Sequence, residues 1–185
     1  MKPRPIAIIT ATLTALTFAT LLVFIATPLH TVLFALVPAD GAVTSAQRMS
    51  LDASTVQFLL TGNRAALGLY SAVERSHLAD VRVRVWWDVC LMLISTLGML
   101  MLRPTAAEWR RAAWWVAGGV LAVSVLFQPL FILMHQVLFP GGNWELPSSQ
   151  FVITRVYPLG FFVGAWLLIG VIATGSLWGL SKLRK

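Results

Sequence analysis

Charged residues are scarce along this chain, and their spacing leaves four long apolar stretches between them. These stretches cover about residues 6–34, 85–102, 112–134 and 156–180. Each approaches or exceeds the roughly 20 apolar residues that an α-helix needs to cross a bilayer. We therefore predict an all-α integral membrane protein, in which residues 1–185 form a single membrane domain with four transmembrane helices.

The first apolar stretch follows a basic start, as the apolar core of a signal peptide also does. No charged residue occurs between positions 6 and 37, after Lys2 and Arg4. The apolar core of a cleaved signal peptide is only about 7–15 residues long. We therefore expect this stretch to remain in the protein as its first membrane span.

The composition agrees with the pattern, because 58% of the residues are hydrophobic and only 11% are charged. A soluble domain averages about 25% charged residues. The net charge of +7 is also unevenly distributed. If the N-terminus faces the cytoplasm, that side carries eight Lys and Arg residues against Glu108, while the other side carries six Arg against six acids. Basic residues mark cytoplasmic loops, so we expect both termini in the cytoplasm and no nucleic-acid partner.

Three connecting segments follow from this topology. We expect an extracytoplasmic helical cap over about 38–84, a cytoplasmic loop over 103–111 and an extracytoplasmic loop over 135–155. The cytoplasmic loop is too short to hold a site. A site would therefore lie at the outer face, between the cap and the second external loop.

The cap contains the signals of two helices. Ser54 and Gln57 have the spacing of a capping box, and Gly62 is a plausible helix stop. We expect apolar surroundings for three residues of this helix: Val56, Leu59 and Leu60. A second helix is predicted to begin between 67 and 72 and to continue without a break into the second span.

Ionisable residues form one stripe on that second helix. Glu74, His77, Asp80, Arg84 and Asp88 are spaced by three or four residues, which places them on one helical face. A carboxylate beside an imidazole orients it and stabilises its charged form. The alternative is a solvated face of ion pairs, each contributing about 0.2–0.5 kcal/mol, and spacing alone slightly favours that alternative.

His135 changes this balance, because it ends the third apolar stretch at the same predicted membrane face as His77. Ionisable groups at membrane depth are rare and often functional. Two histidines at one depth can divide acid and base roles. We rank His30 below them because no acid lies within four residues of it. A metal site made from Glu74, His77, Asp80 and His135 is a weaker possibility, since no recognised metal motif is present.

Two stretches of the chain resemble one known family. Residues 74–82 read ERSHLADVR, and residues 134–162 read MHQVLFPGGNWELPSSQFVITRVYPLGFF. They resemble the two signatures of the lipoprotein intramolecular transacylase family, with Leu78 in place of a usual Met and Arg82 in place of Lys. The resemblance implies a bacterial cytoplasmic-membrane acyltransferase. It would move the sn-2 acyl chain of a diacylated lipoprotein onto the α-amino group of the N-terminal cysteine, giving the lyso-form.

The resemblance also implies that His77 and His135 are the catalytic residues. We expect Glu74 and Asp80 to orient His77, and Asn143 to donate to an oxygen of the substrate. Trp144 is a further supporting residue. Four aromatic residues are candidates for the walls of the substrate pocket: Phe139, Trp87, Phe151 and Tyr157. The expected partners are the lipid-modified N-terminus of a lipoprotein and membrane lipid, with no cofactor and no metal.

Two other functions are compatible with these residues. One is a metal-dependent membrane hydrolase that uses the acidic and histidine side chains as ligands. The other is a non-catalytic membrane subunit that binds a partner through its charged cap.

Overall fold

The structure is a computed structural model that describes residues 4–38 and 43–183. Within these two ranges the chain is helical and contains no β-strand. The helices are α1 (Pro5–Ile25), α2 (Thr27–Leu36), α3 (Ser45–Thr61), the 3₁₀-helix η1 (Arg64–Leu67), α4 (Ala72–Leu102), α5 (Ala106–Val125), α6 (Phe127–Leu138), α7 (Val152–Val156) and α8 (Leu159–Leu183). The prediction of an all-α fold is confirmed.

Three of the described helices, α1, α4 and α8, are long and apolar enough to cross a membrane, and α5 with α6 qualify as a fourth if that bent pair is one span. Two of the predicted spans are therefore interrupted. The breaks fall at Ala26 and Leu126, shortly before Pro28 and Pro129. A proline ring clashes with the carbonyl four residues earlier, so α1 cannot continue past Ile25, nor α5 past Val125.

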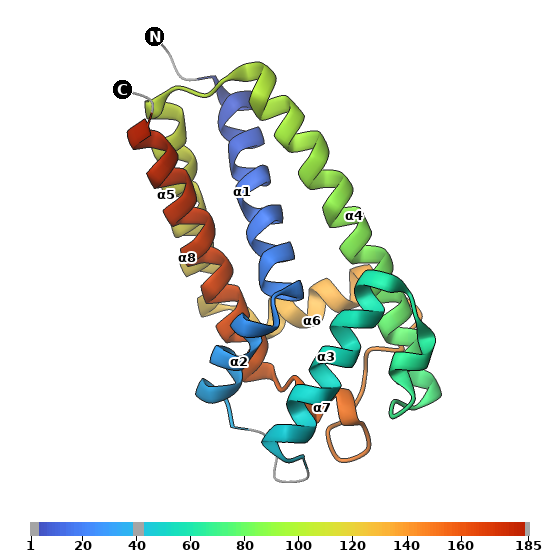
Figure 1. The fold of residues 1–185 in the computed structure, drawn as a ribbon. Helices are drawn as coiled ribbons and strands as arrows, with labels where there is room; N and C mark the ends of the chain where they lie inside the picture. The colour runs from blue at the N-terminus through green and yellow to red at the C-terminus, as the bar shows by residue number, and fades with distance from the viewer. Residues whose placement is uncertain (1–3, 39–42, 184–185) are drawn as a thin grey trace. The chain divides into compact units, whose positions relative to one another are not determined.

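The chain forms two compact units. The first combines Met1–Val23, Trp86–Val125 and Trp166–Lys185, and within it α1, the second part of α4, α5 and α8 run side by side (Figure 1). Small residues allow these helices to approach closely. Four alanines of α1 are buried, at Ala7, Ala11, Ala15 and Ala19.

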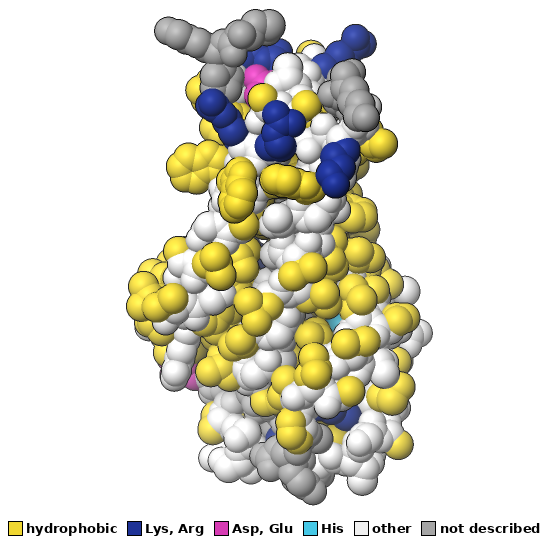
Figure 2. Space-filling view, turned by 90° about the vertical axis from the view of Figure 1, so that its left-hand side faces the viewer, with side chains coloured by type: hydrophobic (Ala, Val, Ile, Leu, Met, Phe, Trp, Pro, Cys, Tyr) yellow, Lys and Arg dark blue, Asp and Glu magenta, His cyan; other side chains and the backbone are white. Residues whose placement is uncertain are grey.

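An ion pair closes one end of this first unit. The Arg4 guanidinium donates to both carboxylate oxygens of the buried Glu108, over 3.0 and 2.8 Å. Glu108 also caps α5 reciprocally with Thr105. Figure 2 shows Lys and Arg side chains gathered at the end that carries the α4–α5 connection, with hydrophobic side chains exposed beyond them. This arrangement suits a helix bundle that leaves a bilayer at a basic interface.

The second unit combines Phe24–Val85 and Leu126–Ala165, and its core is built mainly from α3, η1, the start of α4 and α7. Arg48 of α3 is buried at the centre of it. Its Nε donates to the Val156 carbonyl over 2.8 Å, and its Nη1 donates to the Val37 carbonyl over 2.6 Å. Arg48 therefore joins the ends of α2 and α7 to α3.

The cap helix α3 differs from its prediction at one end. A capping box of Thr44 and Gln47 starts it, so the prediction of a start at Ser54 was wrong; the Ser54 hydroxyl instead donates to the Ser50 carbonyl within the helix. The predicted stop is confirmed, because Gly62 adopts the left-handed conformation with φ of 75°. Val56 and Leu59 are buried as predicted, whereas Leu60 is exposed.

Candidate active site

The start of α4 is fixed by a buried carboxylate. Ser71 and Glu74 cap the helix reciprocally, with the Ser71 N–H donating to Glu74 Oε2 over 2.7 Å. The other oxygen, Oε1, accepts from the Ile153 N–H at the start of α7, over 2.8 Å. We expected Glu74 to orient His77, but these bonds are made to backbone groups. Glu74 thus holds the helix that carries His77 against α7.

His77 and His135 lie together, although they come from α4 and from the end of α6. Their ring centroids are 6.2 Å apart, and the rings are inclined by only 26°. Phe139 packs edge-on against His77 at 4.9 Å. His77 is buried, and His135 is half-buried. The two imidazoles predicted from separate segments therefore form one pair with an aromatic wall.

The hydrogen bonding of His135 defines which of its nitrogens can accept a proton. Its Nδ1 lies 2.8 Å from the Phe131 carbonyl oxygen, one turn earlier on α6. A carbonyl can only accept a hydrogen bond, so Nδ1 carries the hydrogen. In the neutral ring Nε2 is then the acceptor. Phe131 and Trp144 pack against the same ring, with centroids at 4.2 and 5.2 Å.

Asn143 is hydrogen-bonded to Asp80 and Ser76, on the helix that carries His77. The Asn143 Nδ2 donates to Asp80 Oδ2 over 2.7 Å and to the Ser76 hydroxyl over 3.3 Å. A carboxylate accepts but does not donate, so Asp80 fixes the amide with its nitrogen toward α4. Asn143 and Asp80 form a polar pair beside His77. Neither Asn143 Oδ1 nor His77 Nδ1 has a hydrogen-bond partner among the described residues.

A tight turn and one arginine place this loop beside α4. Gly142 has φ of 74°, a conformation that costs other residues about 1–2 kcal/mol. The Arg84 Nη2 donates to the Leu138 carbonyl over 2.6 Å, at the end of α6. The guanidinium carbon lies 5.9 Å from the centre of the Phe139 ring. These contacts hold the loop that carries Phe139, Asn143 and Trp144 next to His77.

The other three predicted wall residues have different surroundings from Phe139. Phe151 is half-buried and packs against the core of the second unit. Trp87 belongs to the first unit and is 62% exposed. Tyr157 contacts Asp52 rather than the histidine pair. Of the four aromatic candidates, Phe139 contacts both catalytic candidates directly.

A second polar cluster was missed by sequence reasoning. The His30 Nδ1 lies 2.7 Å from Asp52 Oδ1, and the Tyr157 hydroxyl donates to the same oxygen over 2.7 Å. Burial and the neighbouring Asp52 raise the pKa of Tyr157 well above its ordinary value, so its hydroxyl keeps the hydrogen that it donates. The acid near His30 is 22 residues away in sequence, so helical spacing alone does not reveal it.

No group of three or more His, Cys, Asp or Glu side chains among the described residues is placed to hold a metal ion. The His77–His135 pair brings two imidazoles from different helices to one place. Aromatic rings surround them on several sides. Asp80 and Asn143 supply the polar neighbours.

Three comparisons bear on what such a site does. The family model described as "Lipoprotein intramolecular transacylase Lit" matches residues 5–162. The fold is similar to the in meso structure of the membrane integral lipoprotein intramolecular transacylase Lit from Bacillus cereus. That match has a TM-score of 0.76 and 15% identity, and it covers 97% of this chain and 92% of the other.

A structure of the same Bacillus cereus protein with a histidine-to-arginine substitution matches with a TM-score of 0.66 and 15% identity. It covers 97% of this chain and 88% of the other. No curated protein sequence matches the chain. At this identity the two structures show a shared fold.

Proposed function

The chain belongs to the lipoprotein intramolecular transacylase family, and from this premise we propose the reaction that it catalyses and the residues that carry it. The enzyme is a membrane acyltransferase that acts on lipoproteins. In the proposed reaction, the sn-2 acyl chain of a diacylglyceryl-cysteine moves onto the α-amino group of that same cysteine. The product is the lyso-form lipoprotein.

The pairing of His77 with His135 is the observation that carries this proposal. The nucleophile and the ester belong to one substrate molecule, so the protein needs no serine or cysteine nucleophile of its own. The amine nitrogen attacks the ester carbonyl, the bond to the glyceryl oxygen breaks, and the proton lost by the amine ends on that oxygen. Two imidazoles 6.2 Å apart can accept the first proton and return one.

The hydrogen bonds suggest how the two histidines divide these roles. His135 has its Nε2 lone pair available, because its Nδ1 hydrogen is donated to Phe131, so we assign it as the base. We assign His77, with Asn143 and Asp80 beside it, to the developing oxyanion and the leaving oxygen. Holding amine and ester together in the right orientation can contribute about 7–11 kcal/mol to an intramolecular reaction.

We also propose that both termini face the bacterial cytoplasm and that the histidine pair faces the outer side of the inner membrane. The net charge supports this orientation, because one side of the predicted topology carries all of the excess Lys and Arg residues. The positive-inside rule places that side in the cytoplasm. Reporter fusions at the C-terminus and in the loop after Phe139 would show opposite sidedness.

The reaction is tested by tandem mass spectrometry of a lipoprotein N-terminus from cells with and without this chain. Acyl transfer within one molecule leaves its total mass unchanged and moves one acyl chain into the amine-containing fragment. Hydrolysis would instead remove the mass of one acyl chain. When isotope-labelled and unlabelled lipopeptides are mixed, no labelled acyl chain should appear on an unlabelled peptide. Such a product would contradict the intramolecular route.

A further inference from the structure

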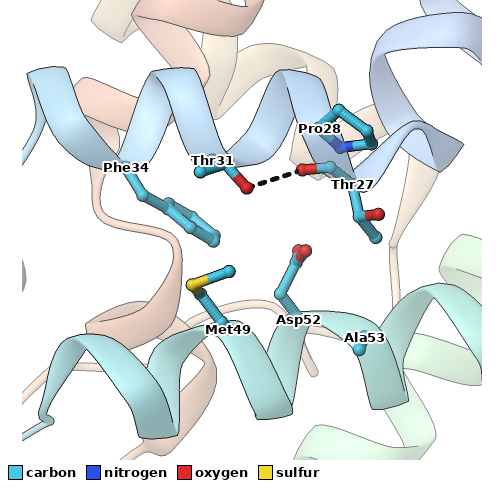
Figure 3. A pocket seen from close by; sticks show the side chains of 7 residues that line it. All are labelled: Thr27, Pro28, Thr31, Phe34, Met49, Asp52 and Ala53. Carbon is cyan, nitrogen blue, oxygen red and sulfur yellow. Dashed lines mark hydrogen bonds between the residues drawn. The ribbon is translucent and has the colours of Figure 1, made fainter.

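Apart from the histidine pair, the second unit contains a pocket to which the proposed reaction assigns no role. It lies between α2 and α3 and has a volume of about 420 Å³ (Figure 3). Asp52 of α3 faces it from one side, and the hydroxyls of Thr27 and Thr31 lie on the α2 side. Asp52 is the single charged residue among the seven that line the pocket.

The carboxylate of Asp52 is fixed in place from two other elements. His30 of α2 and Tyr157, which precedes α8, both bond to its Oδ1 over 2.7 Å. Asp52 is only 3% exposed, yet it still forms part of the pocket wall. A buried charge is costly unless it is paired, and His30 pairs with Asp52 as an ion only when its imidazole is protonated. The pocket therefore presents a preorganised acceptor that a cationic group would complement.

Arg48 does not supply that cation within the pocket. It lies one turn earlier on α3 and interacts with Asp52 electrostatically, but its guanidinium donates to the carbonyls of Val37 and Val156. Its Cζ lies 3.9 Å above the ring of Phe34, and Arg48 is not among the lining residues. The charge that faces the pocket space is that of Asp52.

The residues that line the pocket also indicate which kind of cation it would bind. The Thr31 hydroxyl donates to the Thr27 carbonyl over 3.1 Å, which leaves its oxygen able to accept. An ammonium group has three donors, and it can share them between Asp52 and the threonine hydroxyls. The other walls are apolar, from Pro28, Phe34, Met49 and Ala53. These walls suit the hydrocarbon that carries a primary amine better than they suit a hydrated inorganic cation.

One large apolar side chain that lines the pocket is exposed. Met49 is 51% exposed, and two residues of α2 that do not line the pocket, Val32 and Leu36, are 55% and 74% exposed. Exposed apolar side chains of this kind are stabilised by contact with acyl chains. We propose that the pocket between α2 and α3 binds a primary ammonium group carried on a lipid, with Asp52 as its counter-ion.

Two lipids can supply this chemistry: an ethanolamine phospholipid, or the free α-amino group of a diacylglyceryl-cysteine. The test uses the purified full-length chain in detergent and measures binding by native mass spectrometry. The probe is dioctanoyl phosphatidylethanolamine, compared with its N-acetyl derivative, which has the same tails and no ammonium. We expect the N-acetyl derivative to bind at least tenfold more weakly. Equal binding of the two would overturn the proposal.

Variants locate the site. Asp52→Asn should weaken binding of the probe at least tenfold, whereas Glu145→Gln, which removes an exposed acid from the same unit, should not change it. Because Asp52 is buried, Ala53→Leu provides a second test that fills the pocket from an exposed position and leaves the carboxylate in place. Wild-type affinity in either folded variant would overturn the proposal.

Competition identifies the source of the ammonium. A diacylglyceryl-cysteinyl peptide with a free amine should displace the probe if the substrate occupies this pocket, and its N-acetyl form should not. If neither form displaces the probe, the pocket belongs to the phospholipid head group. The inference does not depend on acyl transfer. His135→Ala, which the proposed reaction requires to be inactive, should bind the probe as the wild type does.

Discussion

The hydrogen bond between Asn143 and Asp80, beside His77, gives a prediction with a definite size. In Asp80→Asn the side chain keeps its shape but can both donate and accept. The introduced asparagine side chain therefore no longer determines whether the Asn143 amide nitrogen or oxygen faces α4. The original bond, 2.7 Å from Asn143 Nδ2 to Asp80 Oδ2, lies at an exposed position. Solvent screening therefore limits its contribution to about 1 kcal/mol.

That free energy sets the expected change in rate. A loss of 1.36 kcal/mol in transition-state stabilisation is tenfold in rate, so about 1 kcal/mol corresponds to about a fivefold fall in kcat. The KM should stay within about twofold, because the Asn143 amide lies beside His77 and is not assigned to bind the lipid. The assay is conversion of a synthetic diacylated lipopeptide by purified protein, followed by tandem mass spectrometry.

A matched control separates orientation from general charge effects. Glu145→Gln removes a nearby exposed acid, two residues after Asn143, and should leave both constants unchanged. Asn143→Leu removes this hydrogen bond altogether and should lower kcat at least as much as Asp80→Asn. The reasoning fails if Asp80→Asn keeps the wild-type kcat, or if Glu145→Gln lowers kcat to the same extent.

Three further substitutions test how the structure holds the site and the bundle. The Glu74 carboxylate accepts from two backbone N–H groups, and Glu74→Gln places an amide NH₂ opposite one of them. Chemical denaturation should show a loss of about 2 kcal/mol in unfolding free energy. An unchanged unfolding free energy would refute the buried role of Glu74. Gly142→Ala, at φ of 74°, should cost about 1–2 kcal/mol and slow acyl transfer, whereas Gly141→Ala, with open space around it, should do neither. In the first unit, an added Cβ at Gly170 would lie 2.7 Å from Val120 Cγ1, so Gly170→Ala should destabilise the bundle by about 1–3 kcal/mol. The control is Gly175→Ala, because an added Cβ there has nothing within 4 Å. Equal unfolding curves for the two variants would contradict the close packing at Gly170.

The sequence predicted the parts of the fold that depend on local pattern. Uncharged runs of membrane-spanning length identified the long helices, and Gly62 marked the end of α3 because only a residue tolerant of positive φ fits there. The start of α3 was missed because two capping-box spacings compete, and the pattern at Ser54 and Gln57 lies inside a continuous helix. The breaks near Pro28 and Pro129 were readable from the prolines, but hydropathy alone joined the helices on either side.

The site was predictable only as far as its parts carry local signals. His77 and His135 were brought together by topology, since both were expected at the same membrane face. The partners of Glu74 could not be read from spacing, because Ile153 lies 79 residues away in sequence. The same is true of Tyr157 and Asp52, separated by 105 residues. Such contacts depend on tertiary packing, which the periodicity of a single helix does not encode.

The central claim is that His77 and His135 together perform the acyl transfer, and single-turnover tandem mass spectrometry tests it most directly. The diacylated lipopeptide is mixed with wild-type protein, His77→Ala or His135→Ala, each confirmed to be folded and retained in the membrane fraction. The wild type should convert the substrate into an isomer of equal mass with one acyl chain on the amine, and both variants should leave the substrate unreacted. Wild-type conversion by either variant, or a product lighter by one acyl chain, would contradict the two-histidine transacylase.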